Sequence, residues 1–309
     1  MPRRERVDAL IVGAGVAGIS TALWLRDFGI ESLLLEGASQ PGGQLHDIHA
    51  PVMNYLLAYG WEGGRLAAGI LNDARSAGLR MLVGSPVGRI AARTRRVERD
   101  GERFEGRTLV VATGLRRRTL GVPGERELLG HGVSHSANLD RTSYTGLPVV
   151  VVGGGTAAIE DALLCAELGS PVTLLHRSAT FRARTDFLAR AREESDIRIV
   201  TNARVVRISG SDRVEGVTYR VRGVSRPKTI EANAVFVRIG WEPRSELVRG
   251  QLRLDRGGFV RVGSAGLTSV PGVYAAGDVC APRSPSIATA AGQGAAVAWE
   301  IVRALGRLR

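Results

Sequence analysis

The chain has 309 residues, a formal net charge of +12, 44% apolar residues and 40 glycines. This length predicts two domains, and the composition is typical of an α/β protein with many tight turns. No apolar run is long enough to span a membrane, and the basic residues are scattered instead of forming an aromatic-interleaved patch. Cys165 and Cys280 are too far apart for a C-x-x-C pair. We expect a cytoplasmic protein that binds neither nucleic acid nor membrane and has no metal site.

The first predicted elements are a strand, a glycine turn and a helix. The apolar run 9–12 leads into Gly13-Ala14-Gly15-Val16-Ala17-Gly18 and then into an Ala/Leu-rich stretch. Such a turn directs backbone N–H groups and the positive end of the helix dipole at a pyrophosphate. The next strand ends at Glu36, whose carboxylate suits ribose hydroxyls without a 2′-phosphate. This pattern predicts an FAD site made by Gly13, Gly15, Val16, Ala17, Gly18 and Glu36.

The chain then alternates between helical and extended patterns. A helix is predicted near 63–77 and β-structure over 81–108, followed by a buried strand that ends in the small residues Ala112-Thr113-Gly114. Small residues at a strand end permit close approach of a ligand. A crossover into a second domain is expected at 116–121.

A second glycine cradle opens the next domain. The run of four valines at 149–152 leads into Gly153-Gly154-Gly155-Thr156-Ala157-Ala158, and the following strand ends at His176-Arg177, with Arg182 close behind. Guanidinium groups bind phosphate oxygens in a bidentate fork, so these cations suit a 2′-phosphate. The pattern predicts an NADP(H) site made by Gly153, Gly155, Thr156, Ala157, His176, Arg177 and Arg182. Proteins with two such cradles usually pass electrons between two dinucleotides.

The last third of the chain is predicted to close the second domain and then add a final strand and helix. A strand over 234–239 precedes a second crossover near 241–243, and a strand over 272–276 ends at Gly277-Asp278 before an Ala/Gly-rich helix.

Taken together, these motifs resemble the low-molecular-weight thioredoxin reductase family over essentially the whole chain. The likeness includes Gly42-Gly43-Gln44-Leu45, Ala112–Gly114 with Arg118, Gly277-Asp278, and the stretch 176–183, in which Ser178 replaces an arginine. The resemblance implies two Rossmann-like three-layer domains, an FAD domain of residues 1–117 and 245–309 and an inserted NAD(P)H domain of residues 118–244, in a homodimer. It also adds FAD contacts at Gly43, Gln44, Leu45, Asn54, Val87, Ala112, Thr113, Gly114, Gly277 and Asp278.

The chain departs from this family at its redox motif. Where the family has Cys-Ala-Thr-Cys-Asp, the chain has Ser136-Ala137-Asn138-Leu139-Asp140. A dithiol relay needs two sulfurs close enough to pair, one of them a thiolate. We therefore expect an FAD-dependent oxidoreductase that exchanges electrons directly between the flavin and a small-molecule substrate, with NADPH or O₂ as the second redox partner. His135 and Asp140, within the altered motif, are preferred to His46 and His49 as acid/base groups.

Two alternatives remain open. The first is an electron-transfer flavoprotein of the ferredoxin– or flavodoxin–NADP reductase type, because a charge of +12 would speed docking of an acidic partner protein. The second is a non-catalytic FAD-binding protein, and the retention of Arg177 and Arg182 argues against it.

Overall fold

The chain consists of two compact units, one inserted in the other. The computed structural model describes residues 4–307. The first unit combines the part of the chain up to residue 116 with the part from 242 onward, and the second unit is 117–241. The inserted arrangement confirms the expected fold class. The predicted domain boundaries, 117/118 and 244/245, lie one and three residues from these limits.

A mainly parallel sheet forms the centre of the first unit. Its strand order is β3-β2-β1-β6-β5-β4, and the seventh strand, β17, lies outside this order and pairs in parallel with β6. β17 comes from the C-terminal part of the chain, which therefore returns to the first unit. The strands are β1 (Arg4–Val12), β2 (Ser32–Leu35), β3 (Arg80–Leu82), β4 (Arg89–Ala91), β5 (Arg96–Arg99), β6 (Glu102–Val111) and β17 (Val273–Ala275).

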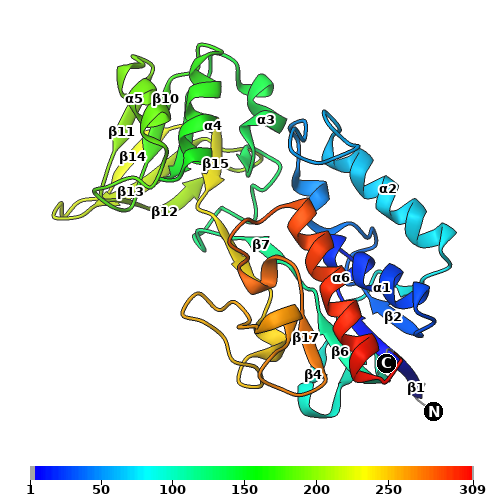
Figure 1. Ribbon diagram of the computed structural model, residues 1–309. Helices are drawn as coiled ribbons and strands as arrows, with labels where there is room; N and C mark the ends of the chain where they lie inside the picture. The colour runs from blue at the N-terminus through cyan, green and yellow to red at the C-terminus, as the bar shows by residue number, and fades with distance from the viewer. Residues whose placement is uncertain (1–3, 308–309) are drawn as a thin grey trace. The chain divides into compact units, whose positions relative to one another are not determined.

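Alternate residues of β1 are buried on opposite faces of this sheet. Ala9 and Ile11 pack in the cluster that includes residues of α1 (Val16–Asp27) and α6 (Ile287–Ala304), two helices that lie side by side in Figure 1. Leu10 and Val12 pack in a second cluster with Phe104. Burial on both faces explains why the strand reads as a continuous apolar run. A further helix, α2 (Gly63–Ser76), follows the 3₁₀ turn η1 (Gly43–Asp47).

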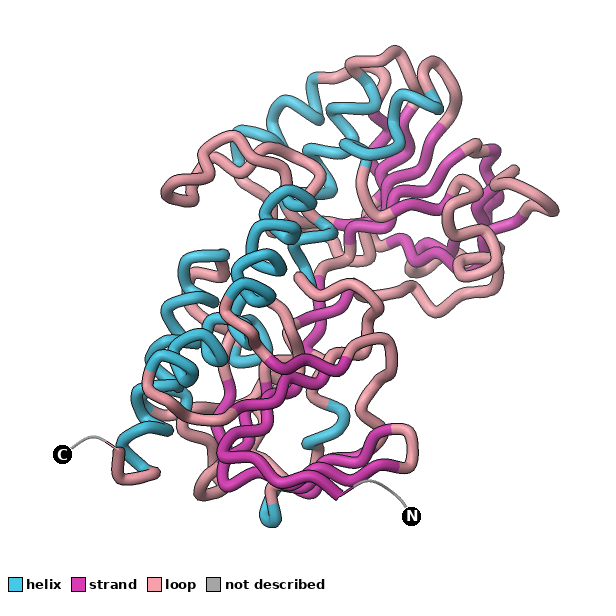
Figure 2. Tube along the Cα trace, turned by 90° about the vertical axis from the view of Figure 1, so that its right-hand side faces the viewer, coloured by secondary structure: helices cyan, strands magenta, loops and turns pink. Residues whose placement is uncertain are grey.

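The second unit repeats the strand–turn–helix plan on its own parallel sheet. Its order is β11-β10-β9-β15-β8, and Figure 2 shows the strands in magenta with the helices in cyan. A separate antiparallel sheet, β12-β13-β14, packs within the same unit. The elements are β8 (Val133–Ser134), α3 (Ala137–Asp140), β9 (Val149–Gly153), α4 (Thr156–Ala166), β10 (Val172–Leu175), α5 (Thr185–Glu193), β11 (Ile197–Val200), β12 (Ala203–Ser209), β13 (Gly216–Val221), β14 (Lys228–Glu231) and β15 (Ala234–Arg238).

The two crossovers pair with each other as short strands, β7 (Leu115–Arg117) and β16 (Trp241–Pro243). Arg116 donates to Glu242 at 2.7 Å and to Glu246 at 3.0 Å. Across residues 4–307, no helix is both long and apolar enough to cross a membrane.

Candidate cofactor and redox site

Two glycines of the first cradle occupy positions that no other residue fits. Gly13 has a φ of +106°, and a Cβ there would lie 2.3 Å from the Ala112 carbonyl oxygen at the end of β6. A Cβ on Gly18 would lie 1.9 Å from the Gly13 carbonyl oxygen. The first glycine therefore makes the turn and the third lets α1 pack against β1, as the sequence pattern predicts. Gly15 caps α1, and Val16 and Ala17 form its first turn.

The carboxylate of Glu36 lies beside this cradle. Its two oxygens accept hydrogen bonds from the backbone N–H groups of Ala14, at 2.7 Å, and Ala38, at 2.8 Å. An ionised carboxylate has about four acceptor positions, so both oxygens keep capacity for ribose hydroxyls. Glu36 therefore fixes the turn and remains suited to the predicted adenosine contact.

The predicted flavin-contacting loop, residues 42–45, contacts the Gly277-Asp278 turn, which comes from the C-terminal part of the chain. Gln44 donates to Asp278 Oδ2 at 3.0 Å, and Gly43 lies so close to Gly15 that a Cβ on it would be 3.3 Å from the Gly15 Cα. Asp278 Oδ1 is buried and has no hydrogen-bond partner among residues 4–307. Burial raises the pKa of Asp278, and the bond from Gln44 opposes this shift. An orphaned buried acceptor fits a hydroxyl donor such as those of a flavin ribityl chain.

The other predicted FAD residues differ in their surroundings. Thr113 donates through Oγ1 to the Arg244 carbonyl at 2.6 Å, and a Cβ on Gly114 would lie 3.5 Å from Gln44 Nε2. Leu45 is buried, and Val87 packs partly buried against the core. Asn54 is exposed, and its side chain makes no hydrogen bond within the described part of the chain.

In the second cradle, the ring of His176 takes the space beside a glycine. A Cβ on Gly154 would lie 2.0 Å from His176 Cε1. The ring is buried, stacks on Phe181 with 4.6 Å between centroids, and donates from Nε2 to the Thr180 carbonyl at 2.9 Å. His176 thus shapes the loop beside the cradle. The loop is also held by the Arg182 N–H, which donates to the Gly154 carbonyl at 2.8 Å.

The two arginines predicted to bind a 2′-phosphate are available for a ligand. Arg177 and Arg182 are exposed, and neither forms an ion pair within residues 4–307. In contrast, Arg184 is held by Asp186 at 2.7 and 3.1 Å. Gly155 caps α4, and a Cβ on it would meet nothing within 4 Å, so the space beside the first turn of this helix, Thr156 and Ala157, is open.

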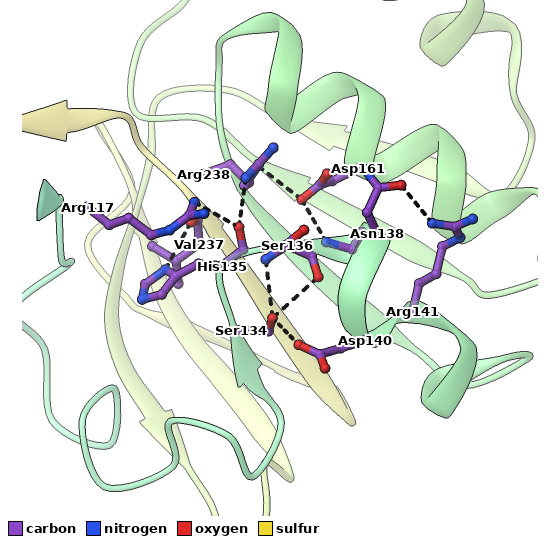
Figure 3. A network of polar contacts seen from close by, with 11 residues as sticks. Arg117, Ser134, His135, Ser136, Asn138, Asp140, Arg141, Asp161, Val237 and Arg238 are labelled. Carbon is purple, nitrogen blue, oxygen red and sulfur yellow. Dashed lines mark hydrogen bonds and ion pairs between the residues drawn. The ribbon is translucent and has the colours of Figure 1, made fainter. Parts of the chain in front are cut away.

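The segment that replaces the dithiol motif is an ordered, hydrogen-bonded turn (Figure 3). Ser134 donates through Oγ to the Asp140 carboxylate, and the Ser136 N–H donates to Ser134 Oγ at 3.2 Å. Ser136 is 7% exposed and Leu139 is 56% exposed. No side chain here can act as a redox thiol.

A buried ion pair, which the sequence patterns did not reveal, holds the same segment. Asp161 on α4 accepts from the Ala137 N–H at 3.1 Å and pairs with Arg238 at 3.1 Å. Arg238 also donates to the His135 carbonyl at 2.7 Å, as Arg117 does at 3.2 Å. Burial raises the pKa of Asp161 to about 6 despite the nearby guanidinium of Arg238. The available signal was charged side chains inside two apolar runs, Glu160 and Asp161 within 157–166 and Arg238 within 234–239.

His135 and Asp140 have different environments. His135 is half-buried, and its Nδ1 donates to the Val237 carbonyl at 3.4 Å, because a carbonyl oxygen can only accept. Figure 3 shows its ring and the Asp140 carboxylate directed to opposite sides of the segment. His46, another histidine considered from the sequence, donates to the Pro41 carbonyl at 2.9 Å.

Both cysteines have strongly raised pKa values. Burial, with a smaller contribution from Asp161, raises the pKa of Cys165 to about 12. Burial, with a smaller contribution from Asp278, raises the pKa of Cys280 to about 12. Because the thiolate is the nucleophilic form of cysteine, neither side chain is a reactive thiol at neutral pH.

Two dinucleotide-binding folds, one inserted in the other and each with a glycine cradle, define the class of two-domain flavin- and nicotinamide-dependent oxidoreductases. The family model of the pyridine nucleotide-disulphide oxidoreductases matches residues 7–295, and the chain belongs to this family. The family binds FAD and NADP(H), and the chain is an FAD-dependent NAD(P)H oxidoreductase.

Individual relatives agree with this assignment. The chain is 36% identical over 306 residues to a thioredoxin reductase of Mycolicibacterium smegmatis, covering 96% of both chains. It is 31% identical to an NADH dehydrogenase of Bacillus subtilis, covering 96% of this chain and 57% of that protein. Among solved structures, the thioredoxin reductase of Lactococcus lactis in its FR conformation matches with a TM-score of 0.81 at 27% identity, covering 98% of this chain and all of that one.

Proposed function

We propose that this oxidoreductase transfers electrons between NADPH and a small-molecule substrate at the flavin itself, without a dithiol relay. The observation that carries this proposal is the turn at 134–140, which is fully ordered by hydrogen bonds and contains no thiol. Cys165 and Cys280, both with a pKa near 12, offer no thiolate to take over the relay. The relatives named thioredoxin reductase therefore share the fold of this chain but not, in our proposal, its reaction.

The residues that we propose for FAD are those of the first unit. The 13–18 cradle would hold the pyrophosphate, Glu36 the ribose, and the Gln44–Asp278 pair the ribityl chain, because Asp278 Oδ1 lacks a donor within the described residues. FAD supplies the capacity to accept and donate a hydride or single electrons. Gln44 orients the Asp278 carboxylate, and Gly43 lets this loop approach the cradle closely.

For NADPH, we propose the 153–156 cradle together with Arg177 and Arg182. Both guanidinium groups are exposed and are not neutralised by a carboxylate within residues 4–307. Both arginines lie on one short loop. The Arg182 N–H donates to the Gly154 carbonyl and the His176 ring lies beside Gly154, so both ends of this loop are held next to the cradle. Preference for the 2′-phosphate follows from the two positive charges and from the ability of a guanidinium group to bind two phosphate oxygens at once.

For proton transfer, we propose His135, with Asp140 in support. The hydrogen bond from Nδ1 to the Val237 carbonyl fixes the ring, and Nε2 is the atom at which we propose that the proton is exchanged. Asp140 fixes Ser134, which in turn holds the Ser136 backbone and so sets the conformation next to His135. The backbone carbonyl of His135 is fixed separately by Arg117 and Arg238.

The test is anaerobic reduction of the purified flavoprotein by NADPH and by NADH, followed by reoxidation with thioredoxin, quinones, other small acceptors or O₂. We expect rapid flavin reduction by NADPH, reoxidation by at least one small acceptor and no turnover of thioredoxin. The Cys280→Ala and Cys165→Ala variants should behave like the wild type. Thioredoxin turnover that disappears in Cys280→Ala would show that a relocated thiol carries the relay. Flavin that neither nucleotide reduces would instead indicate an oxidase reduced by its substrate.

A second candidate function is electron transfer to an acidic redox protein. The net charge of +12 favours it, because complementary charge accelerates the encounter of two proteins. Reduction of an acidic carrier such as a flavodoxin should then slow steeply as ionic strength rises, since salt screens this attraction. Reduction that is slow and insensitive to salt would exclude this function.

A further inference from the structure

A hollow on the first unit is lined by arginines and shares no residue with either glycine cradle. Its volume is about 710 Å³, and its charged side chains are Arg93, Arg95 and Arg253. Gln251 and Ser269 are among its polar residues, and no carboxylate lines it. None of its residues belongs to the cradles or to the Gln44–Asp278 pair. The FAD and NADPH sites therefore leave this hollow unexplained.

A second hollow in the same unit shows that the arginine-rich composition alone does not explain the first one. It measures about 500 Å³ and is lined by three arginines, including Arg89 and Arg103, together with the three acids Glu98, Asp100 and Glu102. There, Arg103 pairs with Glu98 at 3.3 Å. Positive charge is balanced in the second hollow and unbalanced in the first.

Two of the three arginines of the first hollow have no acidic partner among the described residues. Arg93 and Arg253 are exposed and form no ion pair within residues 4–307. Glu105 is a carboxylate that interacts electrostatically with Arg95, and it is already bound by Arg96 at 2.9 Å. Unpaired guanidinium groups around one hollow attract anions.

The backbone holds Arg95 in place at some conformational cost. Arg95 has a φ of +51°, in the left-handed region that a non-glycine residue rarely adopts. Its side chain donates from Nε to the Gly106 carbonyl at 3.4 Å and from Nη1 to the Arg93 carbonyl at 3.5 Å. A Cβ on Gly272 would lie 3.3 Å from Arg95 Cδ, so this glycine makes room for the arginine. Strained residues that the surroundings hold in place are concentrated at functional sites.

Hydrogen bonds also fix the segment of the lining that carries Arg253. Gln251 accepts from the Ala92 N–H at 2.8 Å and donates to the Ile90 carbonyl at 2.8 Å, which joins the segment 250–253 to β4 and the turn that carries Arg93. The Arg253 N–H donates to Ser269 Oγ at 3.0 Å. The three arginines therefore extend from backbone segments that are tied together.

We propose that this hollow binds a small polyphosphate anion, such as the di- or triphosphate group of a nucleotide or free inorganic polyphosphate. Three guanidinium groups can each bind two phosphate oxygens, and together they match a ligand of several negative charges. The volume is within the range of small-molecule sites. This site does not depend on the function proposed above, because it shares no residue with it.

The experiment measures binding of tripolyphosphate by calorimetry to the FAD-loaded protein saturated with NADP⁺, so that both cradles are occupied. We expect the wild type to bind one equivalent of tripolyphosphate. The double variant Arg93→Ala/Arg253→Ala should bind it with an affinity at least tenfold lower. The matched control is Arg89→Ala/Arg103→Ala, which removes the same charge from the second hollow and should change the affinity less than twofold. Arg93→Lys/Arg253→Lys keeps the charge without the planar fork and should fall between the wild type and the alanine pair.

Equal weakening in both alanine pairs would show a general effect of net charge and overturn the proposal, as would a wild-type protein that binds no tripolyphosphate in 50 mM salt. All four exchanged arginines are exposed, so the variants should melt with the wild type. A parallel titration with ATP distinguishes the two sources of the ligand. Tighter binding of ATP than of tripolyphosphate supports a nucleotide, and the reverse order supports free polyphosphate.

Discussion

Replacing Gly18 with alanine should remove the ability of the protein to retain FAD. The new Cβ would lie 1.9 Å from the Gly13 carbonyl oxygen, whereas real Cβ contacts stay above 3.0 Å, so α1 and the turn must separate by at least 1.1 Å. A helical glycine-to-alanine change gains only about 1 kcal/mol from helix propensity. Loss of two hydrogen bonds to the charged pyrophosphate, at about 1.5–3 kcal/mol each, would weaken FAD binding roughly 10²- to 10⁴-fold.

The assay is reconstitution of the apoprotein with FAD, followed by flavin fluorescence, with Gly69→Ala as the matched control. Gly69 lies within α2, and a Cβ there would meet nothing within 4 Å. The control should bind FAD normally and be more stable by about 0.5–1 kcal/mol, because alanine restricts the unfolded chain. Wild-type FAD affinity in Gly18→Ala, or equal losses in both variants, would refute the role assigned to the first cradle.

Three further predictions concern single side chains. Arg177→Ala should raise the KM for NADPH about 10- to 100-fold, through loss of a charge-assisted phosphate contact, and leave that for NADH unchanged; Arg184→Ala, whose charge is already neutralised, should do neither. Because the pKa of Cys280 is about 12, its alkylation by iodoacetamide should be slow at pH 8 and accelerate as pH rises, and a rate at pH 8 like that of free cysteine would contradict this burial. The raised pKa of Asp278 means that the folded apoprotein holds this proton more tightly than the unfolded chain does, so its contribution to stability falls as pH rises above the ordinary value of 3.8. Hydroxyl donors of FAD should lower that pKa, so FAD affinity should increase with pH over this range, and Asp278→Asn should abolish the dependence.

The elements that the sequence predicted best are those whose signals are local. A β-branched run, a glycine turn and an apolar helix follow one another at 149–166, and these short-range preferences agree with the parallel sheet around them. The strand β14, with the sequence Lys-Thr-Ile-Glu, carries no comparable signal. It is extended because it pairs with β13, and a contact between strands cannot be read from either strand alone.

The same distinction separates the parts of the candidate site. The two cradles are local turns, and Gly13, Gly18 and Gly153 are required by atoms within a few residues or at the end of a neighbouring strand. In contrast, Gln44 and Asp278 are 234 residues apart in sequence, and only the family resemblance brought both into the predicted FAD site. No such guide existed for the Asp161–Arg238 pair. Each residue lies within an apolar run of the sequence, and only the structure shows that the two form a buried ion pair.

This pair bears on how the loss of the dithiol should be understood. A segment that had merely lost its function would need no buried charge, since desolvating a carboxylate costs several kcal/mol unless the charge is well paired. Asp161 is nevertheless buried, where it holds the Ala137 N–H, and its partner Arg238 holds the His135 carbonyl. The backbone of His135 and of Ala137, on either side of Ser136, is thus fixed at an energetic cost. A fixed backbone there is useful if His135 must be presented in one orientation, and this is why we assign the proton transfer to His135 and a positioning role to Asp140.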